Sequence, residues 1–383
     1  MNTPTAPTAA GKQVSLVELA LVFLQLGTTA FGGPAAHIAM MENEFVRKRG
    51  WISEAEFLDR LAAASLIPGP SSTEVAIFIG HSKRGWAGLI VAGCCFIIPA
   101  AVLVALIAAA YVRFGSLPRV AGILYGIKPA VIAIIVQALW SLSRTAAKTS
   151  FLVVIGVVCV VLNAEGIPPL TVLALGAVAS AARELLKRRK SLALMLAPKN
   201  CLLLAAAALT APVSFVRLFL SFFKIGSVVF GSGYVLLAFL REEFIDHLHW
   251  LTEKQLIDAV AVGQFTPGPV FTTATFIGYL VAGVRGAVLA TVAIFLPGFI
   301  LVAISGPLLS KIRQSALAAA MLDGVVVGSL ALMVVVGWQL GRAAIVDWRT
   351  IAIFLGSAAV LLRFRTNSAW VIAVSGLLGW IVQ

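Results

Sequence analysis

Two Pro-Gly-Pro tripeptides interrupt apolar stretches of the sequence, at Pro68-Gly69-Pro70 and at Pro267-Gly268-Pro269. Proline lacks an amide proton, and glycine permits unusual dihedral angles and close approach of a ligand. At membrane depth such a break is tolerated only inside protein or beside a water-filled cavity. Each tripeptide therefore predicts a broken or re-entrant helix, and a tight turn between ordinary helices is the alternative.

Polar side chains follow the first tripeptide directly. They are Ser71, Ser72, Thr73 and Glu74. The spacing S-x-x-E is typical of a capping box, in which Ser71 caps the new helix and Glu74 bonds back to the cap. All four are candidates for binding or coupling.

The second tripeptide is followed by Thr272 and Thr273, without the capping box and without the acid. Two helix N-termini with nearby hydroxyl donors would form a cradle for a tetrahedral oxyanion. Because an acid, Glu74, follows only the first tripeptide, we expect transport chemistry to depend more on the first break.

Glycines also gather before each break. Gly32 and Gly33 lie at the end of one apolar run, and Gly231 and Ser232 occupy the matching place in another. Glycine there allows close helix packing or an unwound backbone that contacts substrate. His37 could carry a proton or donate to an anion, although a lone histidine more often packs and hydrogen-bonds.

Ionisable residues in apolar surroundings complete the candidates, because a charge costs ~2.5–3.5 kcal/mol at the centre of a spanning helix. Lys128 could supply a cation for the anion, or pair with Glu74, or extend towards the membrane surface. Lys224 matches Gln25 of the other apolar run, which favours a cavity-facing role. Glu74 could titrate during turnover or simply cap its helix, and Asp323 is a weaker coupling candidate.

Composition places these residues in a membrane protein. The chain is 60% hydrophobic and 12% charged, against about 45–50% and about 25% in soluble domains. The stretches Trp86 to Tyr111 and Val120 to Leu142 are long enough to cross a ~30 Å hydrocarbon layer. The net charge of +13 lies mostly between apolar runs, where Lys and Arg set topology. We therefore expect contact with the lipid bilayer and not with nucleic acid.

The chain contains an internal repeat. A shift of 199 residues places Trp51 on Trp250 and the first Pro-Gly-Pro on the second, and a shift of 198 then places Pro99 on Pro297. Chance does not produce such a run. We predict a first transmembrane repeat at 14–183, a linker with a basic cluster at 184–212, and a second repeat at 213–383.

Each repeat has the same expected order of elements. A first helix (Ser15 to Gly33), a polar connection and a short amphipathic helix (Ser53 to Leu66) lead to the Pro-Gly-Pro. A second short helix, two long spans and two shorter apolar pieces follow. The predicted fold is an all-α polytopic membrane protein with about ten transmembrane helices plus the broken helices.

The loop charges indicate how the repeats are oriented. Arg47, Lys48 and Arg49 of the first repeat match residues 246–248 of the second, which are Asp, His and Leu. Because Lys and Arg favour the cytoplasmic side, the two repeats are predicted to be inverted relative to each other. Whether Leu192 to Thr210 also crosses the membrane decides whether the number of spans before the second repeat is odd or even.

Several of these motifs occur together in one known family. Phe31-Gly32-Gly33-Pro34 with His37, Gly50-Trp51, the stretch Pro68 to Glu74 and Phe78-Ile79-Gly80 resemble the chromate ion transporter family. The two-copy length resembles its long-chain members, and the resemblance covers nearly the whole chain. It implies efflux of chromate across the bacterial cytoplasmic (inner) membrane, driven by a proton gradient or the membrane potential, and hence chromate resistance. The second repeat departs from the pattern at Ser232.

Other functions are less well supported by the sequence. Sulfate has the shape and charge of chromate, so sulfate transport and a passive oxyanion channel are alternatives. A membrane-embedded lipid-phosphate enzyme is more remote, because the sequence contains no H-E-x-x-H motif or Cys/His metal cluster. No catalytic residue, metal or cofactor is predicted. The expected partners are chromate or sulfate and the bilayer, and a homodimer is a possible assembly.

Overall fold

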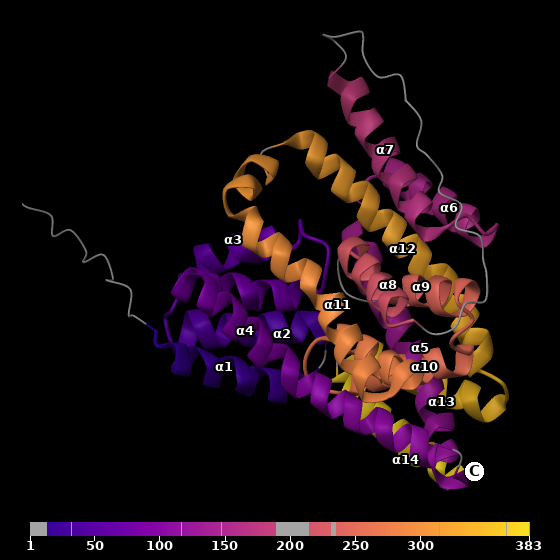
Figure 1. The fold of residues 1–383 in the computed structure, drawn as a ribbon. Helices are drawn as coiled ribbons and strands as arrows, with labels where there is room; N and C mark the ends of the chain where they lie inside the picture. The colour runs from indigo at the N-terminus through magenta and orange to yellow at the C-terminus, as the bar shows by residue number, and fades with distance from the viewer. Residues whose placement is uncertain are drawn as a thin grey trace, which may run out of the picture.

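The computed structural model describes residues 14–31, 33–115, 117–146, 148–188, 214–230, 235–313, 315–364 and 366–382. Within these ranges the chain is helical and contains no strand (Figure 1). Several predictions fall outside the described residues: those for Gly32, Gly231 and Ser232, the linker from residue 189 onward, and the crossing of Leu192 to Thr210.

The two repeats contain matching helices in the same order, and the second has one additional short 3-10 helix, η3. The first repeat consists of α1 (Leu16–Thr29), α2 (Gly33–Glu42), η1 (Asn43–Lys48), α3 (Glu54–Ala64), α4 (Ser71–Phe114), α5 (Pro118–Ala146), α6 (Ser150–Ala164) and α7 (Pro169–Arg188). The second consists of α8 (Phe215–Val228), α9 (Leu236–Arg241), η2 (Glu242–His247), α10 (Glu253–Phe265), η3 (Val270–Thr272), α11 (Thr273–Arg313), α12 (Ala316–Ala344), α13 (Trp348–Phe364) and α14 (Ser368–Val382).

Matching capping boxes begin the helix before each break. At the start of α3, the Ser53 hydroxyl accepts from the Glu56 amide while the Glu56 carboxylate accepts from the Ser53 amide. Thr252 and Gln255 do the same for α10. These boxes satisfy otherwise unpaired amides at the helix start. The amphipathic helix expected after Ser53 is therefore present, and the polar connection before it folds into two helices that the sequence did not indicate, α2 and the π-helical η1.

The helix after each break folds back on itself. In α4 the reversal lies at Arg84 and Gly85, where Gly85 has φ of 56°. In α11 the matching Gly283 has φ of 61°. A Cβ placed on Gly80 would lie 2.3 Å from the Gly88 carbonyl oxygen, so the two arms approach at backbone distance. The short helix and the long span expected after Pro-Gly-Pro are the two arms of this hairpin.

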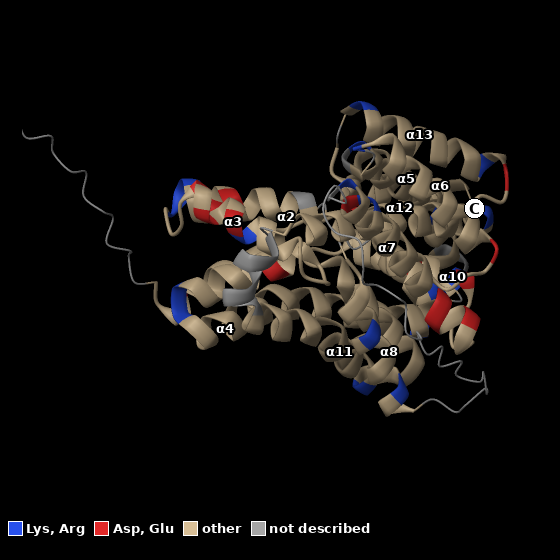
Figure 2. Cartoon of the chain, turned by 90° about the horizontal axis from the view of Figure 1, so that it is seen from above, with Lys and Arg blue, Asp and Glu red and all other residues tan. Residues whose placement is uncertain are grey.

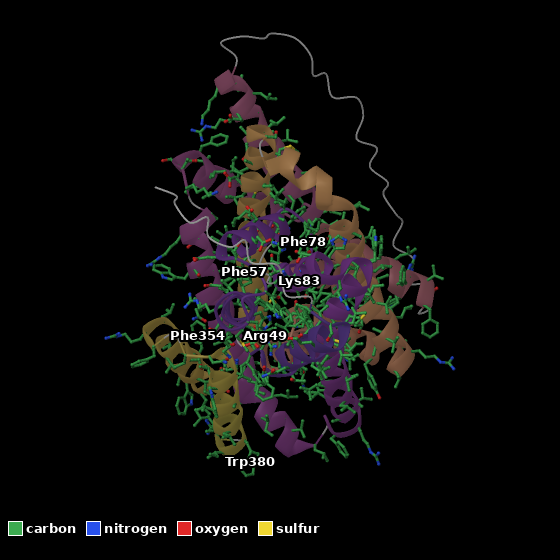
Figure 3. The ribbon with its side chains drawn as sticks, turned by 90° about the vertical axis from the view of Figure 1, so that its left-hand side faces the viewer. Arg49, Phe57, Phe78, Lys83, Phe354 and Trp380 are labelled. Carbon is green, nitrogen blue, oxygen red and sulfur yellow. The ribbon has the colours of Figure 1, made fainter. Side chains whose placement is uncertain are left out.

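The repeats are interlocked. Helix α5 of the first repeat packs against α13 and α14 of the second, and α12 of the second packs against α6 and α7 of the first. Glycines form both seams: a Cβ on Gly126 would lie 1.9 Å from the Ser375 carbonyl oxygen, and one on Gly324 would lie 2.2 Å from that of Gly176. Small residues of this kind let membrane helices approach closely. In Figure 3, Trp380 marks the outer end of α14, at the edge of the bundle.

Five helices among the described residues are long and apolar enough to cross a membrane. They are Ser71–Phe114, Val120–Arg144, Pro169–Lys187, Val270–Ile304 and Ala316–Ala344, and three shorter apolar helices accompany them. Figure 2 shows charged residues mainly at helix ends and on short helices such as α3, while the long helices are largely uncharged. The molecule has the pattern of a multi-pass membrane protein. The number of about ten spans and the inversion of the repeats stay predictions.

Candidate oxyanion and proton site at the paired helix breaks

Each break is bonded to the end of the first helix of the other repeat. The Gly69 amide donates to the Val229 carbonyl at the end of α8, with N and O 2.7 Å apart. The Gly268 amide donates to the Ala30 carbonyl at the end of α1, at 2.9 Å. These two bonds involve equivalent positions under the shift of 199. The repeats are therefore related reciprocally at the breaks.

Both central glycines need the backbone conformation that only glycine adopts easily. Gly69 has φ of 133° and Gly268 has φ of 90°. A Cβ on Gly69 would lie 2.1 Å from Glu74 Oε1, and one on Gly268 would lie 2.6 Å from the Ala100 side chain. The glycines in the tripeptides thus provide both the turn and the room for neighbours.

The capping box expected at Ser71 is wrong. Pro70, in an extended conformation, is the N-cap of α4, and no side chain caps it. Ser71 is already the first helical residue, so it stands one position too late to act as the cap. The carboxyl group of Glu74 is consequently not used by the helix start.

Glu74 is a fully buried acid. Its side chain is 0% exposed, and neither carboxyl oxygen has a hydrogen-bond partner within the described part of the chain. It lies against Gly69 and, across the repeat interface, beside Gly298 of α11, where a Cβ would be 3.7 Å from Oε1. The Thr73 hydroxyl next to it is also buried without a partner there. Acids of this kind inside membrane proteins mark proton or ion pathways.

His37 connects the two breaks. It is 1% exposed, its Nε2 lies 3.0 Å from the Ala30 carbonyl oxygen, and its Nδ1 lies 3.3 Å from the Ser72 hydroxyl. Because a carbonyl only accepts, Nε2 carries a proton, and in the neutral ring Nδ1 accepts from Ser72. Ala30 therefore receives bonds from both His37 and Gly268. Gly33, with φ of 78°, begins the helix that positions His37.

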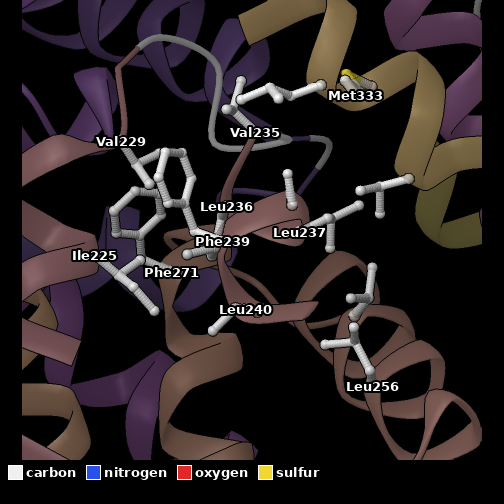
Figure 4. Close-up of a cluster of buried hydrophobic side chains, with 14 of the residues drawn as sticks. Ile225, Val229, Val235, Leu236, Leu237, Phe239, Leu240, Leu256, Phe271 and Met333 are labelled. Atoms are coloured by element: carbon white, nitrogen blue, oxygen red, sulfur yellow. The ribbon is translucent and has the colours of Figure 1, made fainter. Parts of the chain in front are cut away.

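The matching place in the second repeat is apolar. Leu236 stands where the first repeat has His37, and Phe271 stands where it has Ser72; both are buried. Figure 4 shows these two side chains in one apolar cluster with Val229. The hydroxyls of Thr272 and Thr273 donate to the carbonyls of residues 269 and 270, each at 2.8 Å. Of the two breaks, the first is therefore the one with buried polar atoms that have no partner among the described residues, on Thr73 and Glu74.

The charged candidates lie elsewhere and are paired. Lys128 lies 3.5 Å from Asp258, so the predicted alternative that it pairs with Glu74 was wrong. Lys224 lies 2.9 Å from Glu243, and Asp323 lies 2.6 Å from Lys148.

Glu243, on η2, shows how Lys224 is used. Burial acts to raise the pKa of Glu243, but hydrogen bonds from Lys224 and Ser221 outweigh it, and the pKa lies below its ordinary value. The pair therefore fastens η2 to α8. Lys224 is half-exposed there, and the structure does not place it beside the breaks.

Asp258 was missed among the candidates. It is fully buried on α10, although its counterpart Asp59 is exposed on α3. The sequence does contain a signal that could have identified Asp258, because it is an acid within the apolar run that starts at Leu256. Among the residues that the structure describes, no three His, Cys, Asp or Glu side chains are grouped so as to hold a metal ion.

Two interlocked copies of one helical module, with a buried polar cluster where paired helices break, define a multi-pass membrane transport protein. The chain belongs to the chromate transporter family, whose model matches residues 17–181 and 216–380. Both repeats are thus recognised separately.

Curated relatives match this chain over most of their own length. A chromate transport protein of Cupriavidus metallidurans is 33% identical over 100% of this chain and 98% of its own. A probable chromate transport protein of Synechococcus elongatus is 34% identical over 89% of this chain and 88% of its own. A chromate transport protein of Pseudomonas aeruginosa is 30% identical over 96% and 93%, respectively. No solved structure matches the chain at a significant level.

Proposed function

We propose that this protein is a secondary active transporter that exports chromate across the bacterial cytoplasmic membrane and so confers chromate resistance. Family membership supports chromate transport. The observation that carries the proposal is the reciprocal bonding of the two breaks, with the buried Thr73 hydroxyl and Glu74 carboxyl at one of them lacking a partner among the described residues. In this proposal, the start of α4 binds the oxyanion through its positive helix end and the hydroxyls of residues 71–73.

The membrane potential is a sufficient driving force for export. Moving one charge through 100 mV is worth ~2.3 kcal/mol, so a dianion leaving a negative interior gains about 4.6 kcal/mol. That corresponds to a concentration ratio of roughly 10³. A negative charge on Glu74 would repel the dianion beside it, so in this proposal anion binding goes with a neutral Glu74. A proton on Glu74 would then leave with the dianion, so in this proposal the pH gradient modulates the flux through Glu74 while the membrane potential drives export.

We further propose that the repeats are inverted in the membrane. A charge-exchanged pair supports this orientation: Glu42 and Arg47 lie 2.8 Å apart across η1, and their counterparts Arg241 and Asp246 lie 2.9 Å apart across η2. The exchange keeps the ion pair, but its arginine lies near the end of η1 in the first repeat and just before η2 in the second. Together with the loop charges, it favours opposite orientations for the two repeats.

The test is chromate flux into proteoliposomes under a potassium diffusion potential and, separately, under a pH gradient. We expect saturable flux that the potential accelerates and that sulfate, but not molecules of another shape, inhibits. Flux that rises linearly with concentration and ignores both gradients would indicate a passive channel. Absence of chromate and sulfate movement would contradict the proposal altogether.

A further inference from the structure

A buried ion pair joins the two repeats away from the breaks. Asp258 of α10 is 0% exposed, and its Oδ1 lies 3.5 Å from Nζ of Lys128 on α5. Its Oδ2 accepts a hydrogen bond of 2.9 Å from the Tyr111 hydroxyl on α4. The acid belongs to the second repeat, whereas the cation and the phenol belong to the first. The cluster is therefore a contact that must change if the repeats move against each other.

This cluster shares no residue with the proposed oxyanion site at the start of α4. Asp258 lies seven residues before Phe265, where α10 ends ahead of the second break, and at 1.5 Å per helical residue that is about 10 Å along α10. Lys128 is already paired with Asp258. The cluster is thus placed to hold α10 rather than to bind the anion at the break.

The matching place in the other repeat is built differently. Asp59, the counterpart of Asp258, is exposed on α3, and the counterpart of Lys128 is Val326, which cannot form an ion pair. Leu58 is 55% exposed, whereas its counterpart Ile257 is 1% exposed. The exposed surface of α3 also carries Glu54.

Helix contacts show the same asymmetry. Helix α10 packs against α5, α12 and α14 in addition to α11, whereas the contacts of α3 are mainly with α4 and α11. In Figure 1, α10 lies among the helices of the interlocked bundle and α3 lies on the far side of α11. Two helices of equivalent sequence position are therefore in unequal positions, one enclosed and one exposed.

We propose that Asp258, Lys128 and Tyr111 form a latch that holds α10 closed against the first repeat and that must open during each transport cycle. The inference rests on the proposed alternating movement of the two repeats. Removing one partner leaves a buried charge unpaired, which strongly disfavours the closed arrangement. Because Val326 replaces the cation on the other side, the same aspartate–lysine pair cannot form at the matching place.

The test measures access to α10 without any substrate. All four native cysteines are replaced by serine, Ile257→Cys is introduced as the reporter, and the full chain is placed in lipid nanodiscs that expose both faces. The rate of reaction with a charged maleimide is recorded. With the latch intact, the Ile257→Cys reporter should react slowly, and a Leu58→Cys reporter in a separate protein should react fast.

We expect Asp258→Asn to accelerate the reaction of the Ile257→Cys reporter about tenfold or more. Tyr111→Phe removes one hydrogen bond only and should accelerate it a few-fold. The charge exchange Lys128→Asp with Asp258→Lys should return the rate to within about twofold of the original. Asp59→Asn, the matched control on α3, should leave the rate unchanged.

An unchanged rate in both Asp258→Asn and Tyr111→Phe, with the protein still monodisperse, would overturn the latch. An equal acceleration by Asp59→Asn would overturn it too, because the effect would then not belong to this cluster. If Asp258→Asn does not fold, Tyr111→Phe and the charge exchange decide the result. No chromate is used, so failure here leaves the proposed transport function standing, and failure of chromate flux leaves this measurement valid.

Discussion

Glu74 has no acidic counterpart in the second repeat, where threonines follow the Pro-Gly-Pro. It is enclosed by Gly69 of its own repeat and Gly298 of the other. The counterpart of Gly298 is Ala100, whose methyl group fills the matching space beside Gly268. Two small differences, an acid and a glycine, therefore place a buried carboxyl group on one side and an apolar contact on the other.

Glu74→Gln should keep the fold and remove the response of chromate flux to an imposed pH gradient. Glutamine keeps the shape of the side chain but cannot gain or lose a proton. Flux in proteoliposomes is measured with and without the gradient, at fixed membrane potential. Glu56→Gln is the matched control, because Gln255 already serves the equivalent capping box in the second repeat. A gradient response that survives Glu74→Gln would exclude this acid as the coupling group.

Replacing Ser71, Ser72 and Thr73 with alanine should raise the KM for chromate about tenfold or more. A hydrogen bond to a charged group contributes ~1.5–3 kcal/mol. Replacing Thr272 and Thr273 with alanine should change the KM less than about twofold, because those hydroxyls donate to backbone carbonyls within their own turn. Concentration dependence of the initial flux measures both variants. Equal losses would refute the asymmetry of the two breaks.

At the scale of elements, the fold-back of α4 and α11 depends on backbone contact between glycines. Gly80→Ala should lower the unfolding free energy by about 1–3 kcal/mol, since its Cβ would overlap the Gly88 carbonyl. Gly356→Ala in α13 is the control, because no atom lies within 4 Å of a Cβ there. Thermal unfolding in detergent compares the two. A Gly80→Ala protein as stable as the Gly356→Ala protein would show that the hairpin tolerates a wider separation.

The elements that the sequence predicted well are those that leave a strong local signal. The internal repeat, the amphipathic helix after Ser53 and the breaks at both tripeptides are examples. The capping box at Ser71 failed because the motif does not reveal that Pro70 already occupies the cap position. The reversal at Gly85 was not recognised, since a single glycine between apolar runs is common in membrane helices.

Long-range pairing could not be predicted at all. Lys128 finds Asp258 in the other repeat, and His37 bonds to Ser72 after the chain has reversed. Neither contact has a sequence spacing that would reveal it. Candidate residues at the breaks followed from local backbone chemistry, whereas the identity of their partners depends on how the two repeats interlock.

At the scale of the whole molecule, neither repeat should be stable alone. Helices α6 and α7 pack on α12, and α13 and α14 pack on α5, so each repeat lacks part of its packing surface without the other. Expressing 1–183 and 213–383 as separate chains should give little membrane-inserted protein for either one. Co-expression should restore a complex that copurifies. Stable accumulation of a single repeat would show that it buries these surfaces in another way, for example in a homodimer.

The interlocked arrangement also means that helices of the first repeat are synthesised well before the helices they pack against. Helix α7 ends at Arg188 and its partner α12 begins at Ala316, 128 residues later. At ~5–20 residues per second, the ribosome needs roughly 6–26 s to deliver that partner. During this interval the α7 surface around Gly176, which packs against Gly324 of α12 in the folded protein, is uncovered and faces lipid or the insertion machinery. The nascent first repeat is therefore the stage of biogenesis at which quality-control proteases have the best opportunity to act.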